Sequence, residues 1–185
     1  MALMYSEPAA LGSPAPDFTL PGVDGKTYRL LDFKDSKALL VIFMCNHCPY
    51  VKAVQGRINA LARQYGSKGI SVVGINPNDS VRYPDDSFEA MKQTASENGY
   101  VFPYLRDEDQ SVARAYGAIC TPEFYLYQPK GNQFILRYRG RLDDNWKDEK
   151  AVTRRDLVQA IENVIAGREP AVDQPASMGC SIKWK

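Results

Sequence analysis

The sequence has no excess of charge and no long apolar run. Lys and Arg total 23 and Asp and Glu total 22, so the net charge is +1. This balance gives no broad electrostatic attraction to nucleic acid or to an acidic membrane surface. The longest apolar run, Ala38–Met44, is much shorter than the roughly 20 residues that span a bilayer. We therefore expect neither a nucleic-acid nor a membrane partner, and the oligomeric state stays open.

The first residues also lack the marks of a secretory signal. Residues 1–18 have no basic start and no continuous apolar stretch. We therefore expect a cytoplasmic protein, and structural disulfides are rare in the reducing cytosol. The four cysteines point instead to redox chemistry, metal binding or simple burial.

Length and composition favour one globular domain. The 185 residues are 44% hydrophobic and 24% charged, which is typical of a folded domain of this size. We predict a single domain over residues 1–185, with a core at about 14–166 and a Pro-containing tail at 167–185.

Apolar patterning predicts alternating strands and helices. Two short strands, Asp17–Leu20 and Thr27–Leu30, flank a Gly-containing turn and form a hairpin. The runs Ala38–Met44 and Ile70–Ile75 predict strands buried on both faces, joined by an amphipathic helix that ends at Gly66. A strand–helix–strand order implies a parallel pair.

Further elements follow in the second half of the chain. Three polar residues, Ser87, Asp109 and Thr153, are expected to cap helices. Glu123–Tyr127 and Gln133–Tyr138 are joined by a short connection and predict an antiparallel pair.

The segment Cys45-Asn46-His47-Cys48 carries the strongest chemical signal. It falls between a buried strand and a helix, where free amides and the helix dipole favour a thiolate. Two intervening residues allow both sulfurs to lie on one turn, and Pro49 suits the first helical turn. The sequence therefore predicts a dithiol redox site.

A metal site is the alternative at the same residues. Cys45, His47 and Cys48 are all metal-ligand types, and Cys120 is a candidate fourth ligand. A structural zinc site usually draws on two such knuckles, and this chain has one. A metal-binding or metallochaperone protein therefore stays an alternative, although we expect no resident metal. Because there is no Gly-rich phosphate-binding loop, we expect no organic cofactor either.

Several motifs together resemble a known superfamily. They are APDFTLPGVDGKTYRL, CNHCPYV, AYGAICTPEFYLYQPKG, YRGRLDD and GCSIKW. Over about residues 14–166 the chain resembles the thioredoxin fold in its peroxiredoxin-like (AhpC/TSA) and TlpA-like form, in a subfamily that carries a thioredoxin-type CxxC. The resemblance implies an α/β fold, with a central mixed sheet flanked by helices and an N-terminal hairpin extension.

The resemblance also implies roles for the two cysteines. Cys45 occupies the place of the attacking cysteine of thioredoxin, and Cys48 that of the resolving one. Cys48-Pro49 also resembles the peroxide-reducing site of peroxiredoxins, but Val41 and Cys45 stand where that site has Pro and Thr. The favoured function is a thiol–disulfide oxidoreductase. The alternative is an antioxidant thiol peroxidase that uses Cys48.

The resemblance further implies a cis bond at Thr121–Pro122, in a turn that faces the dithiol and docks the substrate. Cys120 beside it is near the dithiol or simply buried. Glu123 is either a proton shuttle or, as we favour, a solvated carboxylate. Cys180 is a packed residue or a second resolving thiol.

We expect His47 to stabilise a Cys45 thiolate, together with the helix N-terminus. The pKa of Cys45 should then lie below that of an ordinary thiol, and the couple should be more oxidising than a thioredoxin dithiol. The alternation of Arg137, Arg139 and Arg141 fits either a solvated strand face or a cation near the thiolate. The expected partner is a protein or small-molecule disulfide or thiol, or a hydroperoxide in the peroxidase alternative.

Overall fold

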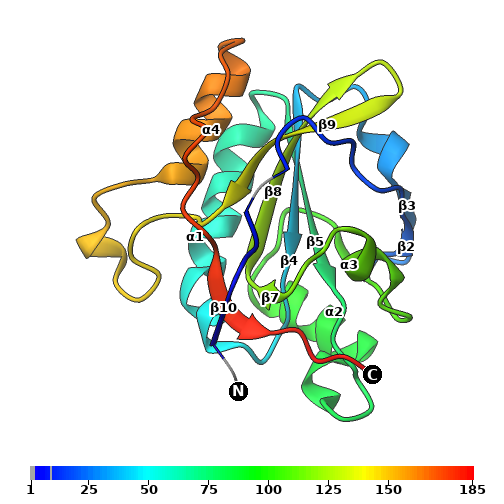
Figure 1. Ribbon diagram of the computed structural model, residues 1–185. Coiled ribbons are helices and arrows are strands. Elements are labelled where there is room, and N and C mark those ends of the chain that lie inside the picture. The colour runs from blue at the N-terminus through cyan, green and yellow to red at the C-terminus, as the bar shows by residue number, and fades with distance from the viewer. Residues whose placement is uncertain (1–2, 9) are drawn as a thin grey trace.

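The computed structural model describes residues 3–8 and 10–185. Its centre is a five-stranded mixed sheet in the order β6-β5-β4-β8-β9 (Figure 1). The strands are β4 Ala38–Phe43, β5 Ile70–Asn76, β6 Tyr104–Arg106, β8 Glu123–Lys130 and β9 Gln133–Gly140. β4, β5 and β6 run parallel, whereas β8 is antiparallel to β4 and to β9. The predicted parallel pair and the predicted antiparallel pair are both confirmed.

Helices cover both faces of this sheet, so the architecture is the expected α/β fold. The helices are α1 Pro49–Gly66, α2 Phe88–Glu97, α3 Ser111–Ala115 and α4 Asp156–Ile165. Single 3-10 turns occur at η1 Leu30–Phe33, η2 Pro84–Asp86 and η3 Glu149–Ala151. No helix in the described residues has the length and apolarity that a membrane crossing requires.

Strand β4 shows why two cores form. All six of its residues are buried, and side chains of successive strand residues point to opposite faces. Leu40 and Ile42 pack in the core that includes α1 and α4. Leu39 and Val41 pack in the core that includes α3 and the N-terminal hairpin. The continuous apolar run therefore becomes a strand covered on both sides.

The N-terminal hairpin is confirmed with slightly different bounds. β2 Thr19–Pro21 pairs with β3 Thr27–Arg29 in an antiparallel register. Leu30, which we expected to end the second strand, instead begins η1.

One of the three expected helix caps is confirmed. The Ser87 hydroxyl accepts a hydrogen bond from the Ala90 amide at the start of α2. The prediction for Asp109 is wrong, because the N-cap of α3 is Gln110 in a left-handed conformation. The prediction for Thr153 is also wrong, because this side chain bonds Asp144 and α4 begins only at Asp156.

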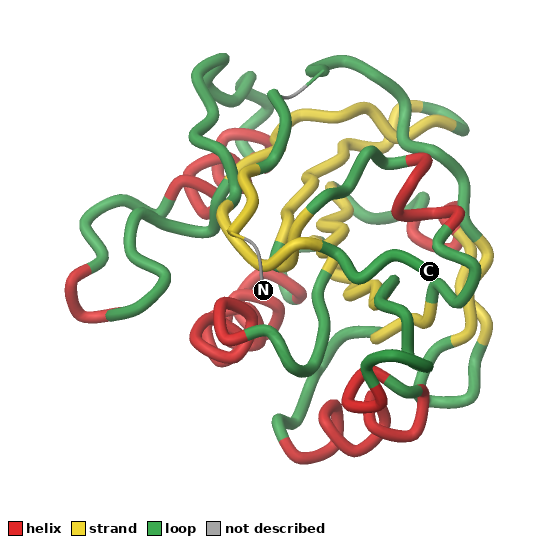
Figure 2. The backbone as a smooth tube through the Cα atoms, turned by 60° about the horizontal axis from the view of Figure 1, so that its bottom comes forward, coloured by secondary structure: helices red, strands yellow, loops and turns green. Residues whose placement is uncertain are grey.

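The C-terminal tail forms a strand that the sequence did not predict. β10 Met178–Ser181 lies between β1 Leu3–Tyr5 and β7 Cys120–Thr121, antiparallel to both. β1 and β10 thus pair although they come from opposite parts of the chain, whose ends are marked in Figure 2. The tail thus returns to the turn at residue 121, next to the start of α1.

Candidate active site

The CNHC segment joins β4 to α1 as expected. Cys48 is the N-cap residue of α1, and Pro49 occupies the first helical position. Cys45 and Cys48 are both thiols in this structure, with exposed fractions of 2% and 0%. The two sulfurs lie at the positive end of the α1 dipole but are enclosed by neighbouring segments.

The Thr121–Pro122 turn lies against both sulfurs. The peptide bond between these residues is cis, as predicted. The Cys45 Sγ is 3.3 Å from the Thr121 hydroxyl oxygen, and the Cys48 Sγ is 3.1 Å from the Thr121 carbonyl oxygen. The predicted proximity of this turn to the dithiol is confirmed.

The two thiols differ in acidity, and in the opposite sense to our expectation. Burial raises the pKa of Cys45 well above its usual value, and the Cys48 sulfur and the Asp86 carboxylate raise it further. A hydrogen bond from Cys45 lowers the pKa of Cys48 to about 5 despite burial, and Cys180 and the Val51 amide add to this. The predicted lowering of the Cys45 pKa is therefore wrong, because burial outweighs the effect of the helix N-terminus.

The Cys48 sulfur forms different hydrogen bonds in its two protonation states. Once ionised, the Cys48 sulfur accepts hydrogen bonds from the Cys45 and Cys180 thiols. When it is protonated, the Cys48 thiol donates to the Thr121 carbonyl oxygen. The turn that is expected to dock the substrate therefore also contacts the sulfur that titrates.

His47 is oriented by a buried carboxylate. Its Nδ1 lies 2.6 Å from Asp86 Oδ2, and its ring stacks on Tyr83 with 5.3 Å between centroids. The imidazole is thus held by η2, and its Nε2 is buried without a hydrogen-bond partner among the described residues. The expected influence of His47 on Cys45 stays a prediction.

Asp86 is a site residue that sequence reasoning missed. It is fully buried and accepts hydrogen bonds from the Asn46 amide at 2.7 Å and from Asn78 Nδ2 at 2.8 Å, besides its contact with His47. Burial would raise its pKa, but these hydrogen bonds hold it below the usual value. Asp86 thereby fixes the conformation of the CNHC loop. Its only sequence signal was an acidic pair after Pro84, in a polar connection.

The candidate metal ligands are only partly gathered. Ligand atoms of Cys45, His47 and Asp86 lie within 4.8 Å of one another, and Cys48 and Cys120 are not in this group. His47 and Asp86 already bond each other. The set expected from sequence is thus replaced by one with a carboxylate.

Our preferred interpretation of Glu123 is wrong. Its side chain is fully buried, and Oε1 forms an ion pair with Arg139 at 2.7 Å. Oε2 accepts from the amides of Ile119 and Cys120, at 2.9 and 3.2 Å. The solvated strand face is likewise wrong for Arg139, which is 8% exposed. The pair lies next to the Thr121–Pro122 turn and supports the backbone that leads into it.

The remaining two cysteines differ in their surroundings. Cys120 is fully buried, with its Sγ 3.7 Å from Glu123 Oε2, and burial raises its pKa. Cys180 lies on β10 with its Sγ 2.9 Å from the Cys48 Sγ, although 132 positions separate them in the chain. Cys180 is therefore a third thiol in contact with the dithiol.

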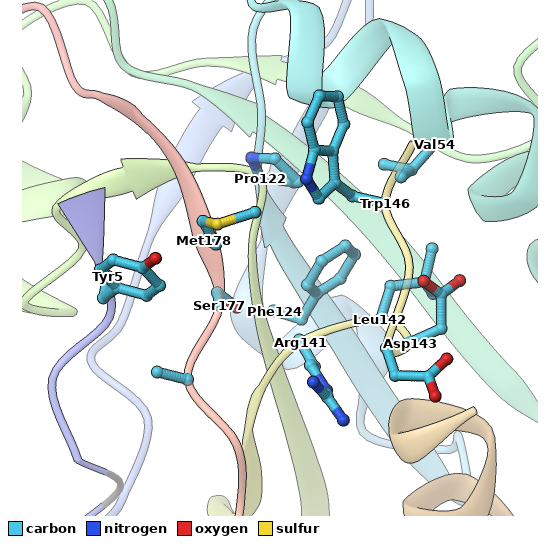
Figure 3. A pocket seen from close by; sticks show the side chains of 12 residues that line it. Tyr5, Val54, Pro122, Phe124, Arg141, Leu142, Asp143, Trp146, Ser177 and Met178 are labelled. Atoms are coloured by element: carbon cyan, nitrogen blue, oxygen red, sulfur yellow. The ribbon is translucent and has the colours of Figure 1, made fainter. Parts of the chain in front are cut away.

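A cavity of about 140 Å³ adjoins the same turn (Figure 3). Pro122 and Met178 form one side, and Trp146 and Val54 form another. Arg141 is charged and also lines it. The cavity extends from the Thr121–Pro122 turn to the loop after β9, and no cysteine lines it.

Residues 11–138 match the model of the AhpC/TSA family. The chain belongs to this family. A relative from Yersinia pestis, named "Thiol:disulfide interchange protein DsbE", is 32% identical over 148 residues, which cover 77% of this chain and 72% of the relative. "Thiol-disulfide oxidoreductase ResA" of Geobacillus thermodenitrificans is 26% identical over 159 residues, 84% of this chain and 78% of that one.

Two solved structures share this fold over nearly the whole chain, and a third shares it over part of the chain. An uncharacterized conserved protein from Geobacillus kaustophilus is 45% identical with a TM-score of 0.93, covering 100% of this chain and 97% of that one. The protein SMc02350 of Sinorhizobium meliloti is 41% identical with a TM-score of 0.91, covering 98% of both chains. A thiol:disulfide interchange protein of the thioredoxin family from Chlorobium tepidum has a TM-score of 0.55 at 24% identity, over 68% of this chain and 84% of that one. The fold is thus thioredoxin-like.

Proposed function

We propose that this protein is a thiol–disulfide oxidoreductase that cycles between a Cys45–Cys48 dithiol and its disulfide. The observation that carries the proposal is the arrangement of both sulfurs against Thr121, next to the cis proline and at the start of α1. The names of the two curated relatives support the same activity.

We propose that Cys48, not Cys45, performs the first step, and the lowered pKa of Cys48 supports this choice. Its thiolate attacks one sulfur of a partner disulfide, and the other partner sulfur leaves with the electron pair and takes up a proton. Cys45 then attacks the Cys48 sulfur of this mixed disulfide. The Cys45–Cys48 bond forms, the bond to the partner breaks, and the proton of Cys45 goes to the released partner thiolate. The partner is reduced by two electrons and the dithiol is oxidised by two.

The enclosure of the sulfurs defines how a partner must approach. Cys45 and Cys48 are at most 2% exposed, so a local opening must precede contact. The cavity beside Pro122, with its apolar walls and Arg141, suits an extended peptide that carries a disulfide. We therefore propose a protein or peptide disulfide as partner.

Reduction of insulin by dithiothreitol tests this function. Wild type should accelerate the reduction, whereas Cys48→Ser should lose the acceleration and Cys45→Ser should stall as a mixed disulfide or turn over slowly. Far-ultraviolet circular dichroism checks that each variant is folded. If Cys48→Ser reduces insulin as fast as wild type, the proposed site is wrong.

A thiol peroxidase is the second candidate, because the lowered pKa of Cys48 at a helix start also suits attack on a hydroperoxide. The Cys48 thiolate would take one peroxide oxygen as sulfenic acid and release the other as alcohol or water. Measuring hydroperoxide consumption alongside insulin reduction separates the two. Rapid peroxide loss with sulfenic acid at Cys48, and no insulin reduction, would assign the site to the peroxidase.

Metal binding is tested in the same samples. We expect insulin reduction to be unchanged by a chelator, because His47 and Asp86 bond each other. Stoichiometric metal in the purified protein, lost to chelator, would instead support the group formed by Cys45, His47 and Asp86.

A further inference from the structure

The sulfur of Cys48 contacts two other cysteine sulfurs, not one. Cys45 hydrogen-bonds it from the same loop. Cys180 approaches from β10, with 2.9 Å between the two Sγ atoms. Thiol–disulfide exchange requires that a third sulfur reach one of the two bonded sulfurs and lose its proton as it attacks. Cys180 already occupies that position relative to Cys48.

The approach of Cys180 is built into the backbone. β10 pairs with β7 so that Cys180 lies opposite Thr121, and β1 pairs with the other edge so that Leu3 lies opposite Cys180. Further hydrogen bonds hold the strand on both sides of the cysteine, from Ser177 Oγ to the Gly140 carbonyl at 2.6 Å and from the Ile182 amide to the Ile119 carbonyl at 3.0 Å. Cys180 is therefore presented to Cys48 by a fixed strand.

Gly179 permits this close approach. A Cβ atom on Gly179 would lie 2.1 Å from the Thr121 carbonyl oxygen and 2.5 Å from its carbon. These are backbone atoms of the docking turn, so a side chain there would force β10 away from the turn and would carry Cys180 with it. Glycine at position 179 thus lets β10 lie close enough to Thr121 for the next residue, Cys180, to contact Cys48.

We infer that Cys180 is a second resolving cysteine for Cys48, acting in parallel with Cys45; this rests on the proposed function, which supplies the mixed disulfide. In this step the Cys180 sulfur attacks the Cys48 sulfur of the mixed disulfide. The Cys180–Cys48 bond forms and the bond from Cys48 to the partner breaks. The partner sulfur leaves with the electron pair and receives the proton that Cys180 releases.

The same geometry lets the two internal disulfides interconvert. When Cys180 attacks the Cys48 sulfur of a Cys45–Cys48 disulfide, Cys45 leaves and takes the proton. No external oxidant or reductant is needed, because one disulfide replaces another. The pKa of Cys180 is raised to about 12, first by burial and then by its contact with Cys48. Burial raises the pKa of Cys45 as well.

Oxidised glutathione serves as the probe, with cysteine-containing peptides mapped by mass spectrometry after acid quenching and alkylation. Four proteins are compared: wild type, Cys45→Ser, Cys180→Ser and the double variant Cys45→Ser/Cys180→Ser. In Cys45→Ser the glutathione adduct at Cys48 should convert to a Cys48–Cys180 disulfide. In the double variant the adduct should persist, decaying at least about ten times more slowly because no oriented thiol remains. Cys180→Ser should form only the Cys45–Cys48 disulfide.

Ser181→Ala in the Cys45→Ser background is the matched control, because it alters the neighbouring residue of β10 and retains the thiol. It should still form the Cys48–Cys180 disulfide. Where Cys180→Ser perturbs folding, as judged by circular dichroism, Cys180→Ala replaces it. Equal persistence of the adduct in Cys45→Ser and in the double variant would overturn the inference while leaving the proposed function intact. A double variant that takes up no glutathione at Cys48 would contradict the proposed function, and this inference with it.

Discussion

Glu123 and Arg139 form a buried ion pair next to the Thr121–Pro122 turn, which contacts the sulfurs of Cys45 and Cys48. The carboxylate accepts two bonds from the guanidinium, at 2.7 and 2.9 Å, and Arg139 also donates to the Gly117 carbonyl. The second carboxylate oxygen of Glu123 accepts hydrogen bonds from two backbone amides in the segment before Thr121. The position of the Thr121–Pro122 turn thus depends on the Glu123 carboxylate, and this buried charge requires Arg139 as its counter-charge.

Arg139→Leu should lower the free energy of unfolding by about 3–5 kcal/mol, because it leaves the Glu123 carboxylate buried without its counter-charge. Arg137→Leu is the matched control, since Arg137 pairs with Glu169 at the surface and such pairs contribute about 1 kcal/mol or less. Urea unfolding with comparable m-values measures both. Similar losses in the two variants would show that the buried pair has no special role.

The ionisation of Cys48 should be visible in the pH dependence of its alkylation. The lowered pKa, about 5, keeps this sulfur ionised at neutral pH, so its alkylation rate should level off above pH 6 and fall as the pH drops through 5. Cys45→Ala removes the largest cause of the lowering, and hydrogen bonds to a charged group contribute about 1.5–3 kcal/mol. The midpoint should then rise by about one to two pH units. A wild-type midpoint near 9 would contradict the thiolate on Cys48.

Gly179→Ala should destabilise the protein by at least about 1–3 kcal/mol, because its Cβ meets the Thr121 backbone. Gly56→Ala is the control. Gly56 lies inside α1 with open space where a Cβ would lie, so alanine there should stabilise the protein by about 0.5–1 kcal/mol. Thermal unfolding measures both changes, and limited proteolysis should show earlier cleavage near residue 180 only in Gly179→Ala. Resistance equal to wild type would mean that β10 tolerates the side chain.

Asp86→Asn should slow insulin reduction and lower the melting temperature. An amide has one acceptor oxygen in place of the two carboxylate oxygens that now serve Asn46, His47 and Asn78, so buried donors lose their partner at about 1–3 kcal/mol each. Asp85→Asn, at the exposed neighbouring position, should leave the melting temperature within a degree or two. If both substitutions act alike, Asp86 does not position the CNHC loop.

Local patterns in the sequence predicted most of the central sheet and the position of the dithiol. The apolar run Ala38–Met44 and the helical periodicity after Pro49 are short-range signals, and both agree with the structure. The cis bond at Thr121–Pro122, which the family resemblance implied, also agrees. Contacts between distant segments had no such signal. No periodic pattern in the sequence indicates that residue 180 pairs with residue 121. None indicates that Asn46, His47, Asn76 and Asn78 surround Asp86.

The charges of the site were harder to predict than its position. Glu123 looked solvated because a strand end is usually exposed, and its partner Arg139 lies across a hairpin whose register includes an irregularity between Leu126 and Tyr127. The thiolate was assigned to Cys45 because a helix N-terminus favours an anion. Burial and the contacts of Cys48 with two other thiols, which arise only in the folded chain, decide the opposite.

The pairing of β10 with β7 has a consequence for molecular recognition. An extended partner could bind by adding a strand to the edge of β7. In this fold β10 already pairs with that edge. A tethered segment competes at an effective concentration in the millimolar range, so a free peptide that offers only backbone pairing is at a disadvantage at micromolar levels. Selectivity then falls to partners that bring additional contacts, such as side chains that fill the cavity lined by Pro122, Trp146 and Met178.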